Sequence, residues 1–125
     1  MAKFNSFEEI NAWQKAYEIT LEVYRITADG GFSKDYGLRD QIRRASVSIM
    51  ANIAEGHGRR SNSEFANFLN IARGSAAEVQ SHLYVAMGLK YIEKEDFDRQ
   101  YSAAEEISRM TLALAKYLRE SDRKS

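Results

Sequence analysis

The sequence contains no cysteine and no proline, and both absences narrow what the chain can be. Without cysteine it forms neither a disulfide framework nor a thiolate zinc site, which fits a reducing, cytoplasmic location. Without proline, no helix is interrupted by a residue that lacks a backbone N–H, so long helices are favoured. The sequence also has no run of about 18 apolar residues and no apolar signal core at its start. Neither a membrane span nor a secretory leader is therefore expected.

The chain also lacks an excess of charge of one sign. Its 18 basic and 18 acidic residues give a formal net charge of zero, which argues against bulk attraction to nucleic acid. The charges are unevenly spread, however. Residues 1–35 hold four basic and six acidic side chains, residues 36–92 hold seven and four, and residues 93–125 hold seven and eight. An anionic partner would therefore be expected at the basic middle of the chain.

The residues that are present indicate one helical domain over residues 1–125. Hydrophobic residues make up 44% of the chain and charged residues 29%, the composition of an ordinary globular protein. Apolar side chains recur at three- and four-residue intervals, which predicts helices at about 7–28, 35–55, 62–89 and 94–120. The connections are short, so neighbouring helices should be antiparallel. The expected fold class is all-α, an up-down-up-down antiparallel four-helix bundle.

Local signals mark where these helices begin and end. Ser6–Glu9 and Ser61–Glu64 match the capping box, in which serine and glutamate satisfy free backbone N–H groups at a helix start. Gly30 and Gly31 are expected to end the first helix, since glycine accepts the left-handed conformation common just past a helix. The stripe expected to face the core from the first helix is Ile10, Trp13, Tyr17, Leu21 and Tyr24. Similar stripes run through the other three helices.

Signals for catalysis or metal binding are weak. There is no Gly-x-Ser-x-Gly elbow and no Walker phosphate loop. His57 and His82 are far apart in the chain, and Glu78 with His82 forms only one pair on one helix face. Di-iron bundles need several such units converging on the core. We therefore expect no catalytic residues, no metal, no cofactor and no small-molecule substrate.

The basic residues are the most suggestive functional feature. The second helix carries arginines one turn apart, and two more precede the start of the third helix, where free N–H groups and the helix dipole favour a phosphate. The alternative is that these arginines solvate exposed faces or pair with Asp40, Glu55 and Glu64. The candidate nucleic-acid-binding residues are Arg39, Arg43, Arg44, Arg59, Arg60 and Arg73.

Polar and small residues on the second and third helices form another candidate feature. Buried polar side chains need partners, so a hydrogen-bonded network between these helices is plausible. Small residues such as Gly74 and Ala77 allow helix backbones to approach closely. Solvent exposure or a subunit interface are the alternatives. The residues proposed for the network or interface are Ser48, Asn52, Glu55, Ser75 and Glu78.

Three blocks of the sequence resemble a known family: residues 7–17 (FEEINAWQKAY), 38–58 (LRDQIRRASVSIMANIAEGHG) and 68–78 (FLNIARGSAAE). They are similar, in order, to the four-helix bundle proteins encoded within intervening sequences of bacterial 23S ribosomal RNA genes. Met50 and Ser33 stand where that family often has proline. The positions that match its motifs are Arg43, Arg44, Asn52, Glu55, Gly56, Ser75 and Glu78.

The resemblance implies a bundle that assembles into a ring-like homopentamer. It also implies kinship with the accessory variability proteins of diversity-generating retroelements, which are basic pentamers that bind nucleic acid and a reverse transcriptase. For the family itself the biochemical function is largely undefined.

Two functions are compatible with these observations. The first is a non-catalytic, homo-oligomeric accessory protein that associates with RNA or a ribonucleoprotein through arginine–phosphate contacts. Such contacts do not read sequence, and repetition around a ring would strengthen them. The second is a protein-interaction scaffold with no nucleic-acid binding.

Overall fold

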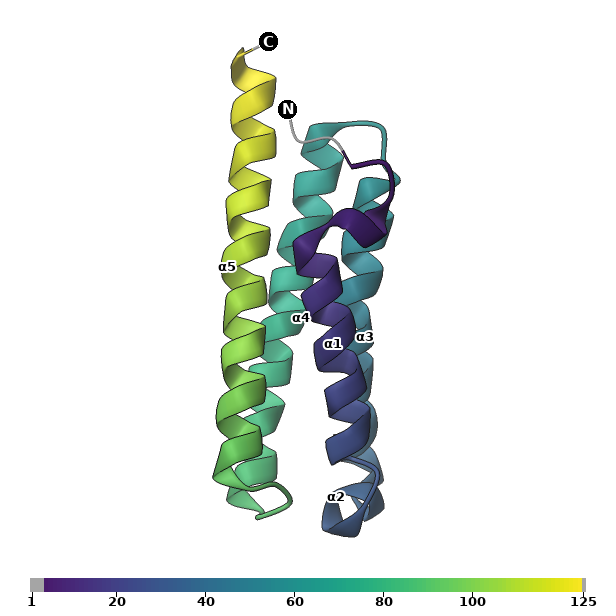
Figure 1. The fold of residues 1–125 in the computed structure, drawn as a ribbon, viewed down its shortest axis with the longest axis vertical. Coiled ribbons are helices and arrows are strands. Elements are labelled where there is room, and N and C mark those ends of the chain that lie inside the picture. The colour runs from purple at the N-terminus through teal and green to yellow at the C-terminus, as the bar shows by residue number, and fades with distance from the viewer. Residues whose placement is uncertain (1–3, 125) are drawn as a thin grey trace.

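The computed structural model describes the backbone of residues 4–124 and the side chains of residues 4–123. Within this part of the chain all regular structure is helical, as expected, and no strand occurs (Figure 1). Four long helices form the bundle, and a single 3₁₀ turn and one short helix precede the second of them. The elements are η1 (Phe7–Glu9), α1 (Asn11–Ile26), α2 (Gly30–Lys34), α3 (Tyr36–His57), α4 (Asn62–Gly88) and α5 (Lys94–Lys124).

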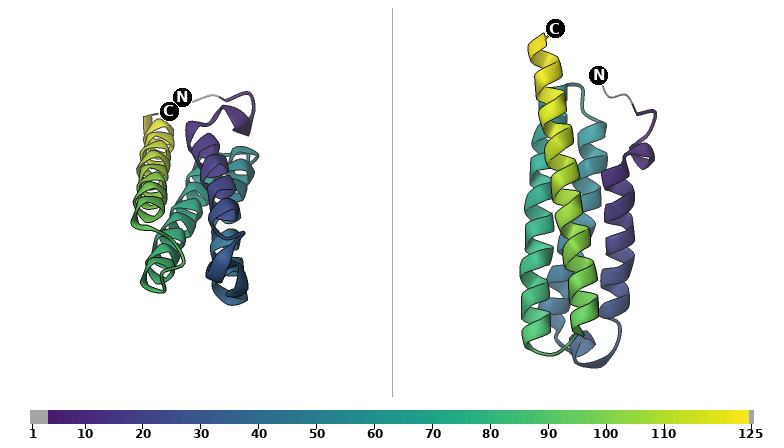
Figure 2. Two further views of the ribbon diagram at one scale, coloured as in Figure 1. Left: turned by 60° about the horizontal axis from the view of Figure 1, so that its bottom comes forward. Right: turned by 60° about the vertical axis from the view of Figure 1, so that its left-hand side comes forward.

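The four long helices are antiparallel to their neighbours in sequence. In Figure 1, α1 descends, α3 ascends, α4 descends and α5 ascends. Helix α3 packs against α1 and α4, and α5 packs against α4 and α1, so α1 and α4 lie on one diagonal of the bundle. The C-terminal turns of α5 extend past the α3–α4 loop, as both views of the bundle show (Figure 2). No helix among the described residues is long and apolar enough to cross a membrane.

The core is filled by apolar residues from all four long helices. On α3 the predicted stripe is confirmed, because Ile42, Ile49 and Ile53 are fully buried. On α4 the buried side chains include Leu69 and Leu83. Burial of each large aliphatic side chain stabilises the fold by about 1.5–3 kcal/mol. Helix α4 therefore shares the core with both of its neighbours, α3 and α5.

The core face predicted for the first helix is wrong for three of its five residues, whereas Ile10 is buried and Trp13 is partly buried against the core. Tyr17, Leu21 and Tyr24 are exposed, and the buried face of this helix is instead Ala12, Ala16, Ile19, Thr20, Val23 and Ile26. Helix α1 carries two apolar stripes on different sides, and the bundle buries the one with smaller side chains. That arrangement lets α1 lie close to its neighbours, and it leaves the aromatic stripe on the surface.

The two capping boxes have different outcomes. Ser61 caps α4 as predicted, since its Oγ accepts a hydrogen bond from the Glu64 backbone N–H at 3.1 Å. Ser6 begins only the 3₁₀ turn η1, without a side-chain cap, and α1 starts later, at Asn11. The carboxylate of Glu9 instead accepts from the Asn5 backbone N–H at 3.1 Å. The first predicted helix therefore begins about one turn too early.

The glycine pair does not simply end a helix; it begins α2. Gly30 has φ of 65°, which is a left-handed conformation that favours glycine. A Cβ on Gly31 would lie 3.0 Å from Cε1 of Tyr91, so this position has no room for a side chain unless Tyr91 moves. The ring of Tyr91 stacks on buried Phe32, and its hydroxyl donates to the Asp35 carboxylate at 3.0 Å. Helix α2 therefore closes the end of the bundle.

Candidate interaction surfaces

Arg39 and Arg43 lie on the side of α3 that faces α1 and α2, and both are engaged within the chain. The guanidinium of Arg43 donates through Nε to Thr27 Oγ1 at 2.8 Å and lies 4.5 Å from the centroid of the Tyr24 ring. Arg39 donates through Nε to Asp40 at 2.9 Å and through Nη1 to the Ser33 carbonyl at 3.0 Å. Both arginines therefore link α3 to the preceding segments of the chain.

Arg59 and Arg60 lie at the other end of the bundle, in the α3–α4 loop. Arg59 pairs with Glu55 at 3.2 Å and its guanidinium lies 4.7 Å from the centroid of the Phe68 ring. Arg60 is exposed and forms no hydrogen bond or ion pair within the described chain. Arg44 is also exposed and forms no hydrogen bond or ion pair within the described chain. It lies on the outer side of α3, beside the α3–α4 groove. Arg44 and Arg60 are therefore the candidate arginines left available for an external anion.

Arg73 belongs to a different surface. It lies on α4 two turns before Gln80, whose side-chain amide donates to the Tyr101 carbonyl and the Glu105 carboxylate of α5. Arg73 therefore faces α5, and its Nη1 donates to Asn70 at 3.3 Å.

The six candidate arginines thus do not form one patch. Arg39 and Arg59 are separated by about 30 Å along α3, from 1.5 Å of rise per residue. The expected pairing with acidic neighbours occurs at Asp40 and Glu55, whereas Glu64 accepts from the Ser61 hydroxyl at 3.2 Å. The arginines are spread over both ends and two sides of the bundle, which the sequence spacing did not indicate.

The polar residues of α3 and α4 are partly brought together. The hydroxyls of Ser48 and Ser75 hydrogen-bond across the helix pair at 2.9 Å, and the Asn52 amide donates to Ser48 Oγ at 3.0 Å and to its carbonyl at 2.8 Å. Glu55 and Glu78 lie outside this cluster and are exposed. The cluster therefore joins α3 to α4, and Glu78 instead lines the shallow groove beside Arg44.

An apolar surface runs along α1 and α3. We call it the α1–α3 face and define it by the residues listed at the end of this paragraph. The Trp13 and Tyr17 rings stack with centroids 5.6 Å apart and an interplanar angle of 4°. At the upper end an apolar hollow of about 240 Å³ is lined by side chains of η1, α1 and α3. The residues of the α1–α3 face are Phe7, Trp13, Tyr17, Leu21, Tyr24, Val47, Met50, Ala51 and Ala54.

The similarity to known proteins extends over most of the bundle and is not limited to one of these surfaces. The family model described as 23S rRNA-intervening sequence protein matches residues 8–113. The chain belongs to this family. Among solved structures it is similar to a protein of unknown function from the S23 ribosomal protein family of Bacteroides thetaiotaomicron, with a TM-score of 0.77 and 26% sequence identity. The similarity covers 84% of this chain and 95% of that one. No curated protein matches the sequence.

The family match includes α1 to α4 and most of α5, so it covers every candidate arginine and every residue of the polar cluster named above. The structure gives one of the motif positions a clear physical role. Gly56 is buried in the last turn of α3, and a Cβ there would lie 2.7 Å from Cβ of Phe68 and 3.0 Å from Cδ1 of Phe65. Only glycine therefore allows α3 and α4 of this family member to approach so closely at their shared loop.

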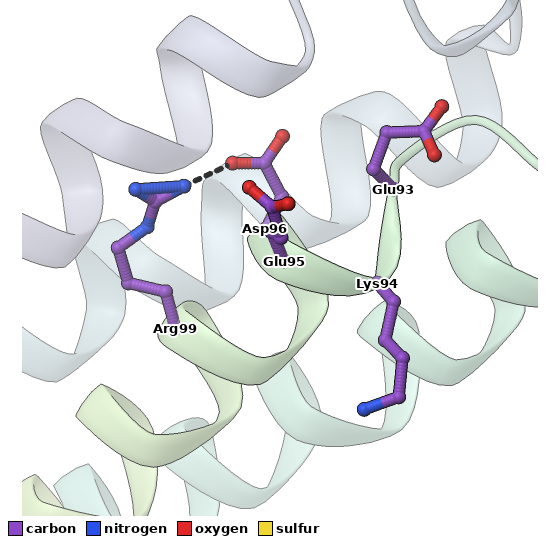
Figure 3. Close-up of a pocket in the computed structure, with 5 residues that line it drawn as sticks. All are labelled: Glu93, Lys94, Glu95, Asp96 and Arg99. Atoms are coloured by element: carbon purple, nitrogen blue, oxygen red, sulfur yellow. Dashed lines mark hydrogen bonds and ion pairs between the residues drawn. The ribbon is translucent and has the colours of Figure 1, made fainter.

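A charged hollow at the start of α5 was not indicated by the sequence. It is lined by Glu93, Lys94, Glu95, Asp96 and Arg99 (Figure 3). Asp96 accepts from Arg99 at 2.7 Å and from Arg25 of α1 at 3.0 Å, while Lys94 points away from this pair and bonds Asp98. Partial burial alone would raise the pKa of the Asp96 carboxyl, but hydrogen bonds from the two arginines lower it below its ordinary value.

The ion pair of Asp96 with Arg25 at this hollow joins α1 to α5. Among the described residues no three His, Asp or Glu side chains are gathered closely enough to hold a metal ion. Further along the same helix pair, Lys15 bonds Glu106 at 2.9 Å. Between these ion pairs, the amide of Gln100 is almost fully buried, and its Nε2 finds no hydrogen-bond partner in the described chain. The α1–α5 contact is therefore more polar than the α3–α4 contact.

Proposed function

We propose that this member of the intervening-sequence family is a non-catalytic, cytoplasmic accessory protein that works as a ring-like homo-oligomer. The observation that carries the proposal is the α1–α3 face. Tryptophan and tyrosine are enriched at the centres of protein interfaces, and here Tyr17 and Tyr24 are exposed while Trp13 is only partly buried beside them. A net charge of zero means that copies of the chain do not repel one another in bulk.

The homopentamer implied by the sequence resemblance is the assembly that we propose. It is tested by measuring the mass of the purified protein in solution, by light scattering or sedimentation, over a range of concentrations. We expect a single species near five times the protomer mass of 14.3 kDa. A species of one protomer mass at every concentration would refute the proposal.

Binding of RNA or a ribonucleoprotein is a second candidate function. Arg44 and Arg60 favour it, because they are exposed and have no partner in the described chain. One copy offers too few such cations for tight binding, but a ring repeats them and gains from avidity. The kinship with accessory variability proteins implied by the resemblance supports the same role.

This second candidate is tested by titrating a structured RNA against the protein at increasing salt. Phosphate contacts predict affinity that falls steeply with salt, and replacing Arg44 and Arg60 with alanine should flatten that dependence. The matched control is Arg39→Ala, which removes an arginine already bonded to Asp40 and Ser33. If the protein binds no RNA even at low salt, the RNA-binding candidate is refuted. The alternative function, a protein-interaction scaffold with no nucleic-acid binding, then remains.

A further inference from the structure

The outer face of α4 is unusual for an exposed helix because its central turns carry almost no charge. Exposed positions recurring at three- and four-residue intervals over about five turns are all uncharged, and three consecutive ones are small. Glu78 lies at the edge of this row, towards the groove with α3. We call the row the α4 ridge, and it consists of Asn67, Asn70, Gly74, Ala77, Ser81 and Val85.

Gly74 at the middle of the ridge has no explanation within the single chain. Glycine inside a helix lowers stability relative to alanine. A Cβ at Gly74 would meet nothing within 4 Å, unlike one at Gly56, which would clash with α4. No close contact inside the bundle therefore requires glycine at Gly74. Close approach of something outside the chain supplies a reason for it.

We propose that the α1–α3 face of one copy packs on the α4 ridge of the next copy. This inference rests on the self-association proposed above and names the two surfaces that meet. The face offers bulky side chains, with Tyr17 46%, Leu21 54% and Tyr24 43% exposed. The ridge offers small side chains at its centre, so the bulky side chains of the face can approach its backbone closely. The residues that define the two surfaces are uncharged, and the cations at the edge of the ridge, Arg73 and Arg119, are held by Asn70 and Asn67.

The size of the α1–α3 face supports a second copy as the occupant. Its most exposed side chains (Tyr17, Leu21, Tyr24 and Val47) present roughly 300 Å², taking about 200 Å² for a whole aromatic side chain and less for an aliphatic one. That is the scale at which an apolar patch marks an interaction site. This area is smaller than the roughly 800 Å² per partner of a standard protein interface, so the flanking residues of the face must also take part in the contact. Nucleic acid is disfavoured here because Arg43, the cation beside this face, is already bonded to Thr27.

The position of the two surfaces fixes the kind of assembly. Helices α1 and α4 lie on one diagonal of the bundle, so the α1–α3 face and the α4 ridge of one copy point in different directions and cannot meet each other. A contact between two different surfaces is head-to-tail. It closes into a ring when the rotation between copies divides a full turn. In such a ring one interface repeats, and each copy has both its α1–α3 face and its α4 ridge covered by a neighbour.

The test uses two variants that each block one surface. Leu21→Arg places a charge on the α1–α3 face, and Gly74→Arg places one on the ridge, both at exposed positions where the helix is retained. We expect each variant alone to lose the assembled mass and sediment as a protomer. An equimolar mixture should form a heterodimer and stop there, because each variant keeps the surface that the other has lost. Lys116→Glu on the exposed side of α5 is the control and should assemble normally.

Other results would overturn the inference in distinguishable ways. If Gly74→Arg assembles like the unmodified protein while Leu21→Arg does not, the face pairs with itself or another surface, and the proposed oligomer still stands. If the mixture stays at protomer mass at high concentration, the pairing is wrong. If the unmodified protein is itself a protomer, the proposed function fails as well. Should Gly74→Arg lose helicity, Ala77→Arg tests the same surface.

Discussion

The close approach of α3 and α4 at Gly56 leads to a prediction with a defined magnitude. Gly56→Ala adds a Cβ that would lie 2.7 Å from Cβ of Phe68, an atom fixed to the backbone that cannot rotate away. Overpacking of this kind costs about 1–3 kcal/mol. The substitution also gains up to about 1 kcal/mol, because alanine favours the helix over glycine. We therefore expect a net loss of about 1–2 kcal/mol in the free energy of unfolding.

A matched substitution in the same helix isolates the steric part of this cost. Gly37 lies in the first turn of α3, and the nearest atom to a Cβ there is Asp35 Oδ1 at 3.9 Å, an ordinary contact. Gly37→Ala should therefore gain the helix propensity, at most about 1 kcal/mol, without any clash. The difference between the two variants then reports the overpacking alone, about 1–3 kcal/mol.

The assay is urea unfolding followed by the helical circular dichroism signal, at one protein concentration for all variants because assembly makes stability concentration-dependent. The dependence on urea should keep its slope, so that a shift in midpoint measures stability. Equal midpoints for Gly56→Ala and Gly37→Ala would show that α3 and α4 are not as close at this loop as the structure places them.

Three further predictions concern polar groups. The pKa of the Asp96 carboxyl is lowered in the folded state, so its ion pairs contribute stability that is present above about pH 3.8 and is lost as the pH falls below it. Asp96→Asn should therefore reduce the loss of stability between pH 6 and pH 3, measured by urea unfolding at both values. In a double-mutant cycle, Ser48→Ala and Ser75→Ala should show a coupling energy of about 0.5–1.5 kcal/mol, and additive losses would contradict their hydrogen bond. Asn52→Leu should lower the thermal midpoint because it removes two hydrogen bonds to Ser48, whereas Glu78→Leu, at an exposed position, should leave the midpoint nearly unchanged. Equal effects of the two substitutions would contradict the placement of Asn52 inside the polar cluster and of Glu78 outside it.

The sequence was sufficient to predict the all-helical bundle because the signals for its long helices agree with one another. The aliphatic stripe of α3, with Ile42, Ile49 and Ile53, could face only a core, and the Ser61 cap fixed the start of α4. The start of α1 was missed because Ser6 and Glu9 match a capping box, although the segment they begin turns away as η1.

The candidate surfaces were harder to predict because they depend on which side of each helix meets a neighbour. On α1, the spacing of Tyr17, Leu21 and Tyr24 predicted the core stripe, but the bundle buries the side that carries aliphatic Ile19, Val23 and Ile26 and leaves the tyrosines at the surface. Spacing placed Arg39 and Arg43 on one helix face, yet it gave no sign of their partners Ser33 and Thr27, which approach only through α2 and the end of α1.

The polar contact between α1 and α5 has a consequence for how the bundle moves. Helix α1 is the shortest of the four long helices, its core face includes small residues such as Ala12 and Ala16, and its contact with α5 includes buried Gln100 without a partner for Nε2. Local opening therefore costs least there, and backbone amides of α1 should exchange with deuterium before those of α3 and α4. Because α1 also carries the aromatic stripe, association of copies would slow that exchange. The helix that is held most weakly in one copy would then be the one that assembly stabilises most.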